Sequence, residues 1–393
     1  MKNSQMKHLA EKPKKNWGKA SSAVTTAVFL LLLFGIAAGS LIAPKKEFSD
    51  TENRPLQQLP KFSFSKLLEG EFTSDFESYV QDQFLWRDKW ISAKNHCEIG
   101  ALKKEINSVF IAEDGYFIED HPKTSYTDEV AQNNILAVSR FAEKNYEKFG
   151  SEHMSVIIAP NAQTVLREKL PSCADPYDQN EFIGRMYEGL PQGVAVDVSE
   201  TLSSHSDEYI YYRTDHHWTS RGAYLAYAQW AQCKGFTVNP YESYEKEILT
   251  DEFLGTVNSK LNLPMQADTI EVLRKGDGYE VLYDDNSSSE DFIDRTYLQS
   301  KDKYGAFFSG NSALVRLNTQ NKNGKKLVVF KDSYANCFVP LLADEFESVY
   351  MVDLRYYNKS VSEFLEEINP TDVMILYNAD SAATDMNLRK IAG

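Results

Sequence analysis

The chain has 393 residues, of which 42% are hydrophobic and 25% charged, as in a globular protein rather than a disordered or fibrous one. The net charge of -15 argues against a nucleic-acid partner, because phosphate groups would be repelled. Four cysteines are too few for a small scaffold held together by disulfides.

The N-terminal region combines a basic tail with one long apolar segment. Residues 1–23 carry six lysines and one glutamate, a charge of +5, whereas residues 24–43 carry no charged side chain. About 20 apolar residues in a helix span the roughly 30 Å core of a bilayer. We therefore expect a single-pass transmembrane anchor at 24–43, with the tail cytoplasmic and the rest of the chain extracytoplasmic. The small residues at 37–40 leave cleavage as a signal peptide open.

This placement puts the cysteines in an oxidising compartment. Cys97, Cys173, Cys233 and Cys337 allow three pairings, and the sequence does not choose among them. No C-x-x-C motif is present, which disfavours zinc-ribbon and thioredoxin-like sites.

The segment after the anchor leads into the main domain. Residues 44–60 are polar and bounded by prolines, and we interpret 44–71 as a membrane-proximal linker. Apolar residues at spacings of three and four predict an amphipathic helix at 72–95, packed on the main domain. Asp114 and Gly115 lie between two apolar runs at 108–120, a pattern that predicts a hairpin with a type I′ turn.

Short apolar runs then alternate with helical segments, which predicts an α/β domain over 72–393 with a mainly parallel sheet covered on both faces. The predicted strands are 154–159, 194–198, 209–212, 327–330, 348–352 and 373–377, and the predicted helices are 128–149, 219–234, 334–343 and 360–368. Residues 241–326 interrupt this alternation and are rich in Asp, Asn, Ser and Gly. We expect them to form a long insertion with exposed loops.

A candidate nucleophile follows the predicted strand 327–330. Ser333 lies just past this strand and opens a helix, where free backbone N–H groups can stabilise a developing oxyanion. The alternative is that Asp332 or Ser333 only caps the helix, since both residue types are preferred N-caps.

A candidate acid–base pair lies at 211–224. In an extended segment Asp215 and His217 project to the same side and His216 to the other. A carboxylate beside a histidine can orient the ring and stabilise its charged form, as a catalytic triad requires. Thr219 is expected to cap the following helix. Two alternatives remain: a metal site of Asp215, His216 and His217, disfavoured because neighbouring side chains diverge, and a structural loop packed by a tryptophan.

Further candidates for substrate or oxyanion binding follow two other strands. Arg355 and Tyr356 come after the strand 348–352, and Asn378 follows 373–377. Asn311 lies in a Gly-Asn pair within the insertion. Each signal is weak alone, because asparagine and glycine are common in turns.

Four motifs in order resemble those of the DHHW protein family: T-E-N-R-P-L at 51–56, D-H-H-W at 215–218, K-D-S-Y-A-N at 331–336 and D-L-R-Y-Y at 353–357. That family is similar to the alginate O-acetylation proteins, which carry an SGNH-hydrolase-like domain. The resemblance implies a flavodoxin-like α/β/α domain in which Ser333, His217 and Asp215 transfer an acyl group to a surface polysaccharide. Two departures are Lys331, where the SGNH pattern has glycine, and the absence of a G-x-N-D block, which leaves Asn378 and Asn311 as candidates for the oxyanion asparagine.

The sequence therefore predicts a membrane-anchored, extracytoplasmic serine O-acyltransferase that O-acetylates a cell-surface polysaccharide. By analogy with the relatives, a multi-pass membrane acyltransferase would deliver the acyl donor. No organic cofactor, metal or nucleic-acid partner is implied. The alternatives are a carbohydrate acetylesterase and a non-catalytic glycan-binding scaffold of an envelope assembly.

Overall fold

The computed structural model describes residues 17–49, 54–276 and 278–393, which form two compact units. The first unit comprises 17–49 and 54–90, and the second begins at residue 91. Residues 1–16 of the basic tail and 51–53 of the T-E-N-R-P-L motif lie outside the described residues. The division into tail, anchor, linker and catalytic domain stays a prediction.

The first unit contains the apolar helix expected near the N-terminus. Within α1 (Trp17–Ile42), the stretch Ser21–Ile42 is long and apolar enough to cross a membrane, and no other described helix is. This helix suits a membrane anchor or a signal sequence. The remaining elements of the unit are β1 (Phe48–Ser49), β2 (Arg54–Pro55), α2 (Phe64–Leu68) and α3 (Glu71–Asp82).

The helix predicted at 72–95 is two helices in the structure. α3 ends before Gln83, and α4 (Arg87–Gly100) begins after Trp86, whose φ of 58° is left-handed. An α-helix cannot continue through that conformation, so the prediction of one helix is wrong. α4 passes from the first unit into the second at residue 91.

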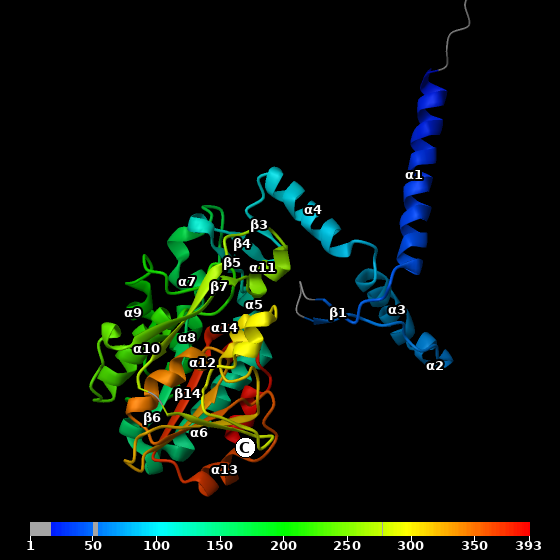
Figure 1. The fold of residues 1–393 in the computed structure, drawn as a ribbon. Helices are drawn as coiled ribbons and strands as arrows, with labels where there is room; N and C mark the ends of the chain where they lie inside the picture. Colours follow the sequence, from blue (N-terminus) through cyan, green and yellow to red (C-terminus); the bar gives the residue numbers. More distant parts are fainter. Residues whose placement is uncertain (1–16, 50–53, 277) are drawn as a thin grey trace, which may run out of the picture. The chain divides into compact units, whose positions relative to one another are not determined.

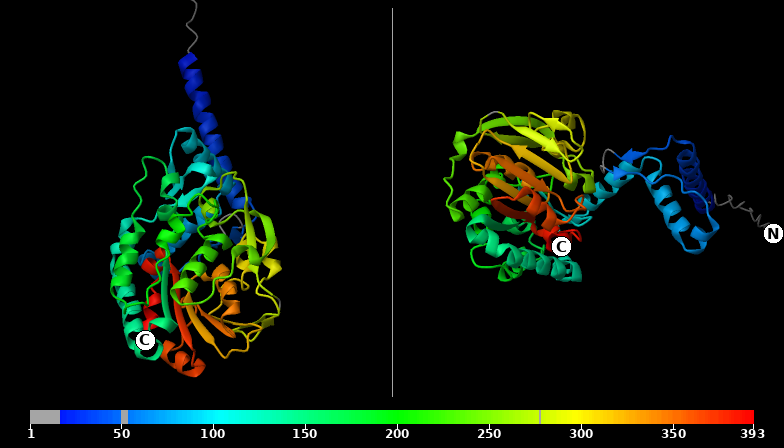
Figure 2. Two further views of the ribbon diagram at one scale, coloured as in Figure 1. Left: turned by 90° about the vertical axis from the view of Figure 1, so that its left-hand side faces the viewer. Right: turned by 90° about the horizontal axis from the view of Figure 1, so that it is seen from below.

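The second unit is built on a seven-stranded sheet with the order β10-β9-β11-β13-β12-β14-β6, drawn in Figures 1 and 2. Its strands are β6 (Met154–Ala159), β9 (Glu280–Tyr283), β10 (Ser288–Ser289), β11 (Leu314–Asn318), β12 (Lys326–Lys331), β13 (Ser348–Val352) and β14 (Asp372–Asn378). The predicted strands 154–159, 327–330, 348–352 and 373–377 are thereby confirmed.

The sheet is mixed rather than mainly parallel. β13, β12, β14 and β6 pair in parallel, whereas β10, β9, β11 and β13 pair antiparallel. The antiparallel strands β9, β10 and β11 all come from 241–326, which is therefore not the loop-rich insertion that we expected. Val281, Val315 and Leu317 of these strands continue the core.

Helices cover both faces of this sheet, so the α/β class is confirmed. Val328 and Phe330 of β12 pack on one face, whereas Leu327 and Val329 pack on the other. The first face is covered by α6 (Glu129–His153), α8 (Gln179–Glu188), α13 (Val361–Ile368) and α14 (Ala379–Thr384). The second is covered by α9 (Ser199–Ser203), α10 (Ser220–Cys233) and α12 (Ala335–Phe338). Thr219 caps α10 through a bond from Gly222 N–H to its hydroxyl, as predicted.

Two smaller sheets and three short helices complete the unit. β3 (Glu105–Ile106), β4 (Val109–Ile111) and β5 (Phe117–Glu119) form one sheet, and β7 (Glu245–Phe253) pairs with β8 (Asp268–Arg274) in the other. The helices are α5 (Lys123–Thr127), α7 (Ala162–Val165) and α11 (Thr256–Leu261).

Three local predictions differ from the structure. Asp114 and Gly115 both have positive φ as predicted, but they lie in a single 3-10 turn, Glu113–Gly115, and the hairpin loop is longer than two residues. The segments 194–198 and 209–212 each form one isolated bridge rather than a strand. All four cysteines are free, Cys337 buried and the others exposed.

Candidate active site

The polar residues of interest gather at one edge of the sheet, where the parallel strands end. Ser333 follows β12 in the turn before α12, and its side chain is partly exposed. Asp353 follows β13, and Asn378 ends β14. This is the edge at which ligands bind in open α/β sheets.

Asp215, His217 and Ser333 lie in hydrogen-bonding contact at this edge. Oγ of Ser333 is 2.7 Å from Nε2 of His217, and Nδ1 of His217 is 2.5 Å from Oδ1 of Asp215. Asp215 and His217 are 3% and 5% exposed, so water has little access to the carboxylate or the ring. The arrangement allows Nε2 to accept the Ser333 proton while Asp215 fixes the ring tautomer.

The backbone around the histidines is bent rather than extended, which corrects the geometric reason given above. Residues 213–217 form a series of bends, and the His217 N–H donates to Oδ1 of Asp215 at 3.1 Å. This local turn, and not strand alternation, brings the two side chains together. His216 lies beside this pair but bonds to a different residue: its Nδ1 is 2.8 Å from Oγ1 of Thr256, and its ring lies beside that of His217 with centroids 3.9 Å apart.

The second oxygen of Asp215 is held by residues that the sequence did not single out. Oδ2 accepts hydrogen bonds from the Thr256 N–H at 2.8 Å and from Oγ1 of Thr256 at 3.0 Å. Gly255 is needed beside them, because a Cβ at that position would lie 2.2 Å from Cβ of Asp215. A Gly-Thr pair opening a short helix carries no signal that links it to Asp215.

A second buried carboxylate anchors the loop that carries Asp215. Asp268 of β8 accepts from the N–H groups of Arg213 and Thr214, at 2.9 and 2.8 Å, and from the hydroxyls of Thr214 and Tyr209, at 2.6 and 2.5 Å. Oγ1 of Thr214 in turn accepts from the Gly255 N–H at 3.1 Å. The loop is therefore fixed to β8 and to the start of α11 at once.

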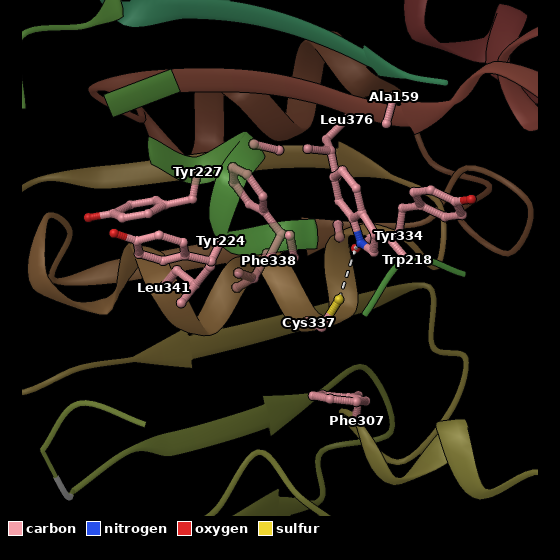
Figure 3. Close-up of a cluster of buried hydrophobic side chains, with 14 of the residues drawn as sticks. Ala159, Trp218, Tyr224, Tyr227, Phe307, Tyr334, Cys337, Phe338, Leu341 and Leu376 are labelled. Atoms are coloured by element: carbon pink, nitrogen blue, oxygen red, sulfur yellow. Dashed lines mark hydrogen bonds between the residues drawn. The ribbon is translucent and has the colours of Figure 1, made fainter. Parts of the chain in front are cut away.

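Aromatic rings confine the imidazole of His217. Tyr304 stacks on it with centroids 3.8 Å apart and an interplanar angle of 15°, and the Tyr304 hydroxyl donates to the Ser333 carbonyl at 3.3 Å. Trp218 lies beside Tyr334 in Figure 3, and its Nε1 donates to the Tyr334 carbonyl at 2.9 Å. These contacts leave the ring little freedom to rotate.

The protonation states suit a general base. Burial would raise the pKa of Asp215, but the adjacent histidines and the bonds from His217 and Thr256 outweigh it and hold that pKa far below its usual range. Burial, together with the nearby His216, lowers the pKa of His217 to about 4, and Asp215 opposes the shift only in part. At neutral pH the carboxylate is ionised and the imidazole is free to accept a proton.

Asp215, His216 and His217 also form the group that could hold a metal ion. Their ligand atoms lie within 4.8 Å of one another, so the argument that these side chains diverge is wrong. Both Asp215 oxygens accept hydrogen bonds, however, and both His217 nitrogens already have partners. A metal would have to displace these contacts, so the donor set fits a proton relay better than a cation site.

The other predicted site residues are placed less favourably. Asn378 is buried, and its amide donates to Oδ2 of Asp332 at 2.6 Å and to Oγ of Ser381 at 2.9 Å, which uses both of its hydrogens. Arg355 donates to both Asp353 oxygens at 2.9 and 2.6 Å, and the adjacent Tyr356 is 46% exposed. Asn311 is exposed, in the loop before β11.

An asparagine outside the predicted set offers an unused amide. Oδ1 of Asn336 accepts from the buried ammonium of Lys331 at 2.8 Å, which leaves the amide nitrogen as its free end. That nitrogen bonds to no described residue, and Asn336 as a whole is 3% exposed. The backbone N–H of Ser333 likewise donates to no atom of the described residues. Burial lowers the pKa of Lys331 to about 8, with Asp353 opposing the shift.

The fold and the site define an α/β protein with a serine–histidine–aspartate arrangement at the sheet edge. The model of the DHHW protein family matches residues 102–352, and the chain belongs to that family, as its motifs predicted. A crystal structure of a DHHW family protein from Eubacterium siraeum has 25% identity and a TM-score of 0.60, over 73% of this chain and 95% of that one.

Two further solved structures match the chain at lower identity. Bacillus cereus PatB1 with a sulfonyl adduct has 18% identity and a TM-score of 0.58, over 71% of this chain and 98% of that one. The O-acetyltransferase domain of Pseudomonas putida AlgJ has 14% identity and a TM-score of 0.43, over 71% and 93%. No curated protein matches the chain significantly.

The low pKa of His217 predicts that activity persists to an unusually low pH. Turnover of a chromogenic acetate ester should stay near its maximum down to pH 6 and fall only as the pH approaches 4, where His217 becomes protonated. The unfolded chain, with a histidine pKa of about 6.5, binds this proton first, so the free energy of unfolding should decrease below that pH. Thermal melting at each pH separates the two effects. Half-maximal kcat/KM near pH 6.5 in a folded protein would contradict the prediction.

Gly255→Ala should misalign the relay, because the added methyl group would overlap Asp215. A displacement of about 1 Å at such a site can lower turnover about 100-fold, and we expect a loss of that size in kcat. The matched control is Gly184→Ala in α8, where a Cβ meets no atom within 4 Å. The control variant should have an unchanged kcat and an unchanged or slightly higher melting temperature.

Replacing Asn336 and replacing Asn378 should have different effects on activity and stability. Asn336→Ala should lower kcat by about 100- to 1000-fold, the usual cost of losing an oxyanion donor, and should also lower the melting temperature, because the buried Lys331 ammonium loses its acceptor. Asn378→Ala should chiefly destabilise the protein, by about 1–3 kcal/mol, because Asp332 loses a buried donor. Exposed Asn323→Ala serves as the control for both measurements. The opposite pattern would return the oxyanion role to Asn378.

Proposed function

We propose that this chain is an extracytoplasmic serine O-acyltransferase that acetylates hydroxyl groups of a cell-surface polysaccharide. The observation that carries the proposal is the continuous relay from Asp215 through His217 to the Ser333 hydroxyl. The SGNH-hydrolase-like, flavodoxin-like assignment of the catalytic domain at 72–393 belongs to the same proposal. The helices on both faces of the sheet support this assignment. The antiparallel strands β9, β10 and β11 extend the sheet beyond the flavodoxin-like pattern.

The reaction follows from the contacts. Oγ of Ser333 attacks the carbonyl carbon of the acyl donor while Nε2 of His217 takes its proton, and the resulting oxyanion accepts bonds from the Ser333 N–H and the Asn336 amide. When the intermediate collapses, His217 returns the proton to the leaving group and an acyl-serine remains. An acceptor hydroxyl then gives its proton to His217 and attacks the acyl-serine, which restores the Ser333 hydroxyl.

The anchor and the partners are part of the proposal. Residues 24–43 would hold the protein in the membrane with the tail 1–23 in the cytoplasm and 44–71 as the connection to the catalytic domain. A multi-pass membrane acyltransferase would supply acyl groups across the bilayer. Arg355 and Tyr356, at the open edge of the site, would contact the acceptor glycan.

Purified full-length protein, incubated with a chromogenic acetate ester and oligosaccharide acceptors, tests the reaction. A mass gain of 42 Da per acceptor hydroxyl, the net addition of an acetyl group, supports transfer. Release of acetate without acceptor labelling indicates the acetylesterase instead. Neither product, together with no labelling of Ser333 by a sulfonyl fluoride, would indicate a glycan-binding scaffold. A chelator should leave turnover unchanged, and zinc-dependent recovery after chelation would favour a metal site.

Alanine replacements should show which of the two histidines takes part in the reaction. Ser333→Ala and His217→Ala should each lower kcat by several orders of magnitude, and the double variant should be little worse, since the groups act as one unit. His216→Ala should cost far less, because its ring nitrogens do not contact Ser333. Folding of each variant is checked by thermal melting. Near-normal activity of folded Ser333→Ala would overturn the serine mechanism.

A further inference from the structure

The first unit exposes an unusual number of large apolar side chains outside α1. Six of them, Phe62, Phe64, Leu68, Phe76, Val80 and Trp86, are between 43% and 75% exposed. We call these six residues the apolar platform. Large exposed apolar side chains in such number are rare on parts of a protein that face only water.

The apolar platform is ordered by its own ring contacts. Phe62 packs edge-on against Phe72 with centroids 5.3 Å apart, and Phe72 stacks with Phe76 at 6.1 Å. Phe72, Phe76 and Val80 recur every four residues of α3, so they form one stripe along that helix. The stripe is therefore part of a regular helix surface.

The opposite side of α3 is already used within the unit. Both oxygens of Asp82 accept bonds from Arg54, at 2.9 and 2.6 Å, and Oδ2 also accepts from the Gln57 N–H at 2.8 Å. These bonds fix the rotation of α3 about its axis. Phe76 and Val80 of the stripe are therefore exposed, whereas Phe72 is partly covered by Phe62 of the same unit.

The end of α3 is attached to the last turns of α1. The Leu85 N–H donates to Oγ of Ser40 at 3.0 Å, and Leu85 packs so closely on Gly39 that a Cβ there would lie 2.7 Å from its side chain. Gln83 and the backbone of Lys46 exchange two hydrogen bonds, at 3.0 and 2.9 Å. Figure 1 shows α3 at the C-terminal end of α1.

Gly39 and Ser40 belong to the stretch Ser21–Ile42 that is apolar enough to cross a membrane. If these residues are in a bilayer, then Leu85 and its neighbour Trp86 lie at the depth of the lipid headgroups. Tryptophan and phenylalanine are favoured at that depth, where an apolar ring meets both acyl chains and water.

We propose that the apolar platform lies in the outer lipid interface of the membrane, beside the end of α1, so that the chain leaves the lipid near residue 90 and not at residue 44. This inference rests on the anchor that forms part of the proposed function. The partner is lipid in general rather than anionic lipid, because α3 carries acidic residues such as Glu71 and Asp75. Zwitterionic bilayers are therefore sufficient, and the contact does not depend on salt.

Full-length protein in nanodiscs of zwitterionic phosphatidylcholine tests the proposal. The emission of Trp86 and Trp90 is obtained as the difference between the protein and its Trp86→Phe/Trp90→Phe variant. Bromine atoms near the head of the lipid acyl chains should quench this emission about twofold, and bromine near the chain ends should quench it less. The matched control is Leu136→Trp, an exposed position of α6 in the second unit, measured in the Trp86→Phe/Trp90→Phe background. Its added emission should not be quenched.

Two further results would overturn the proposal. One is equal emission in brominated and ordinary lipid while mass spectrometry finds α1 retained. The other is a photo-crosslinker at Phe76 that labels a second copy of the chain and not lipid, which would make the platform a dimer contact. Ester turnover by the same samples reports on Ser333 separately, so failure of the lipid contact is distinguishable from failure of the acyltransferase.

Discussion

The site depends on keeping one carboxylate ionised where water scarcely reaches it. Transfer of such a charge out of water costs several kcal/mol unless hydrogen bonds replace its hydration. Asp215 receives four: two from His217, through N–H and Nδ1, and two from Thr256, through N–H and Oγ1. Each of these donors is therefore constrained by the charge that it stabilises. The imidazole takes one orientation, and that orientation points Nε2 at Ser333.

Several of the residues that hold Asp215 and His217 in place come from 241–326. Thr256, Asp268 and Tyr304 hold the carboxylate, its loop and the histidine ring, although none of them follows a parallel strand. The same region adds three antiparallel strands to the sheet. Residues 241–326, which interrupt the α/β alternation in the sequence, thus hold Asp215 and His217 rigidly in place.

The sequence predicted the parts of the molecule that depend on local pattern. β6 and β13 were predicted to the residue because each is a short, mainly apolar run that includes a single serine. Ser333, His217 and Asp215 were identified because strand ends and the D-H-H-W motif carry chemical meaning by themselves. β11 was missed because only Val315 and Leu317 are buried apolar residues, and polar Arg316 lies between them. Asn378 was assigned to the oxyanion because nothing local reveals that Asp332 and Ser381 take both of its amide hydrogens.

The pairing of β6 with β14 sets the order in which the second unit can fold. Met154 of β6 is opposite Val373 of β14, so two strands that are neighbours in the sheet are separated by most of the domain in sequence. Loop closure over such a distance is slow, and contacts of this kind form late in folding. During synthesis β6 has only the single parallel bridge to Ala195 until the C-terminal strand has emerged. A chain truncated before β14 would expose the apolar edges of β6 and β12 together, which favours aggregation over partial activity.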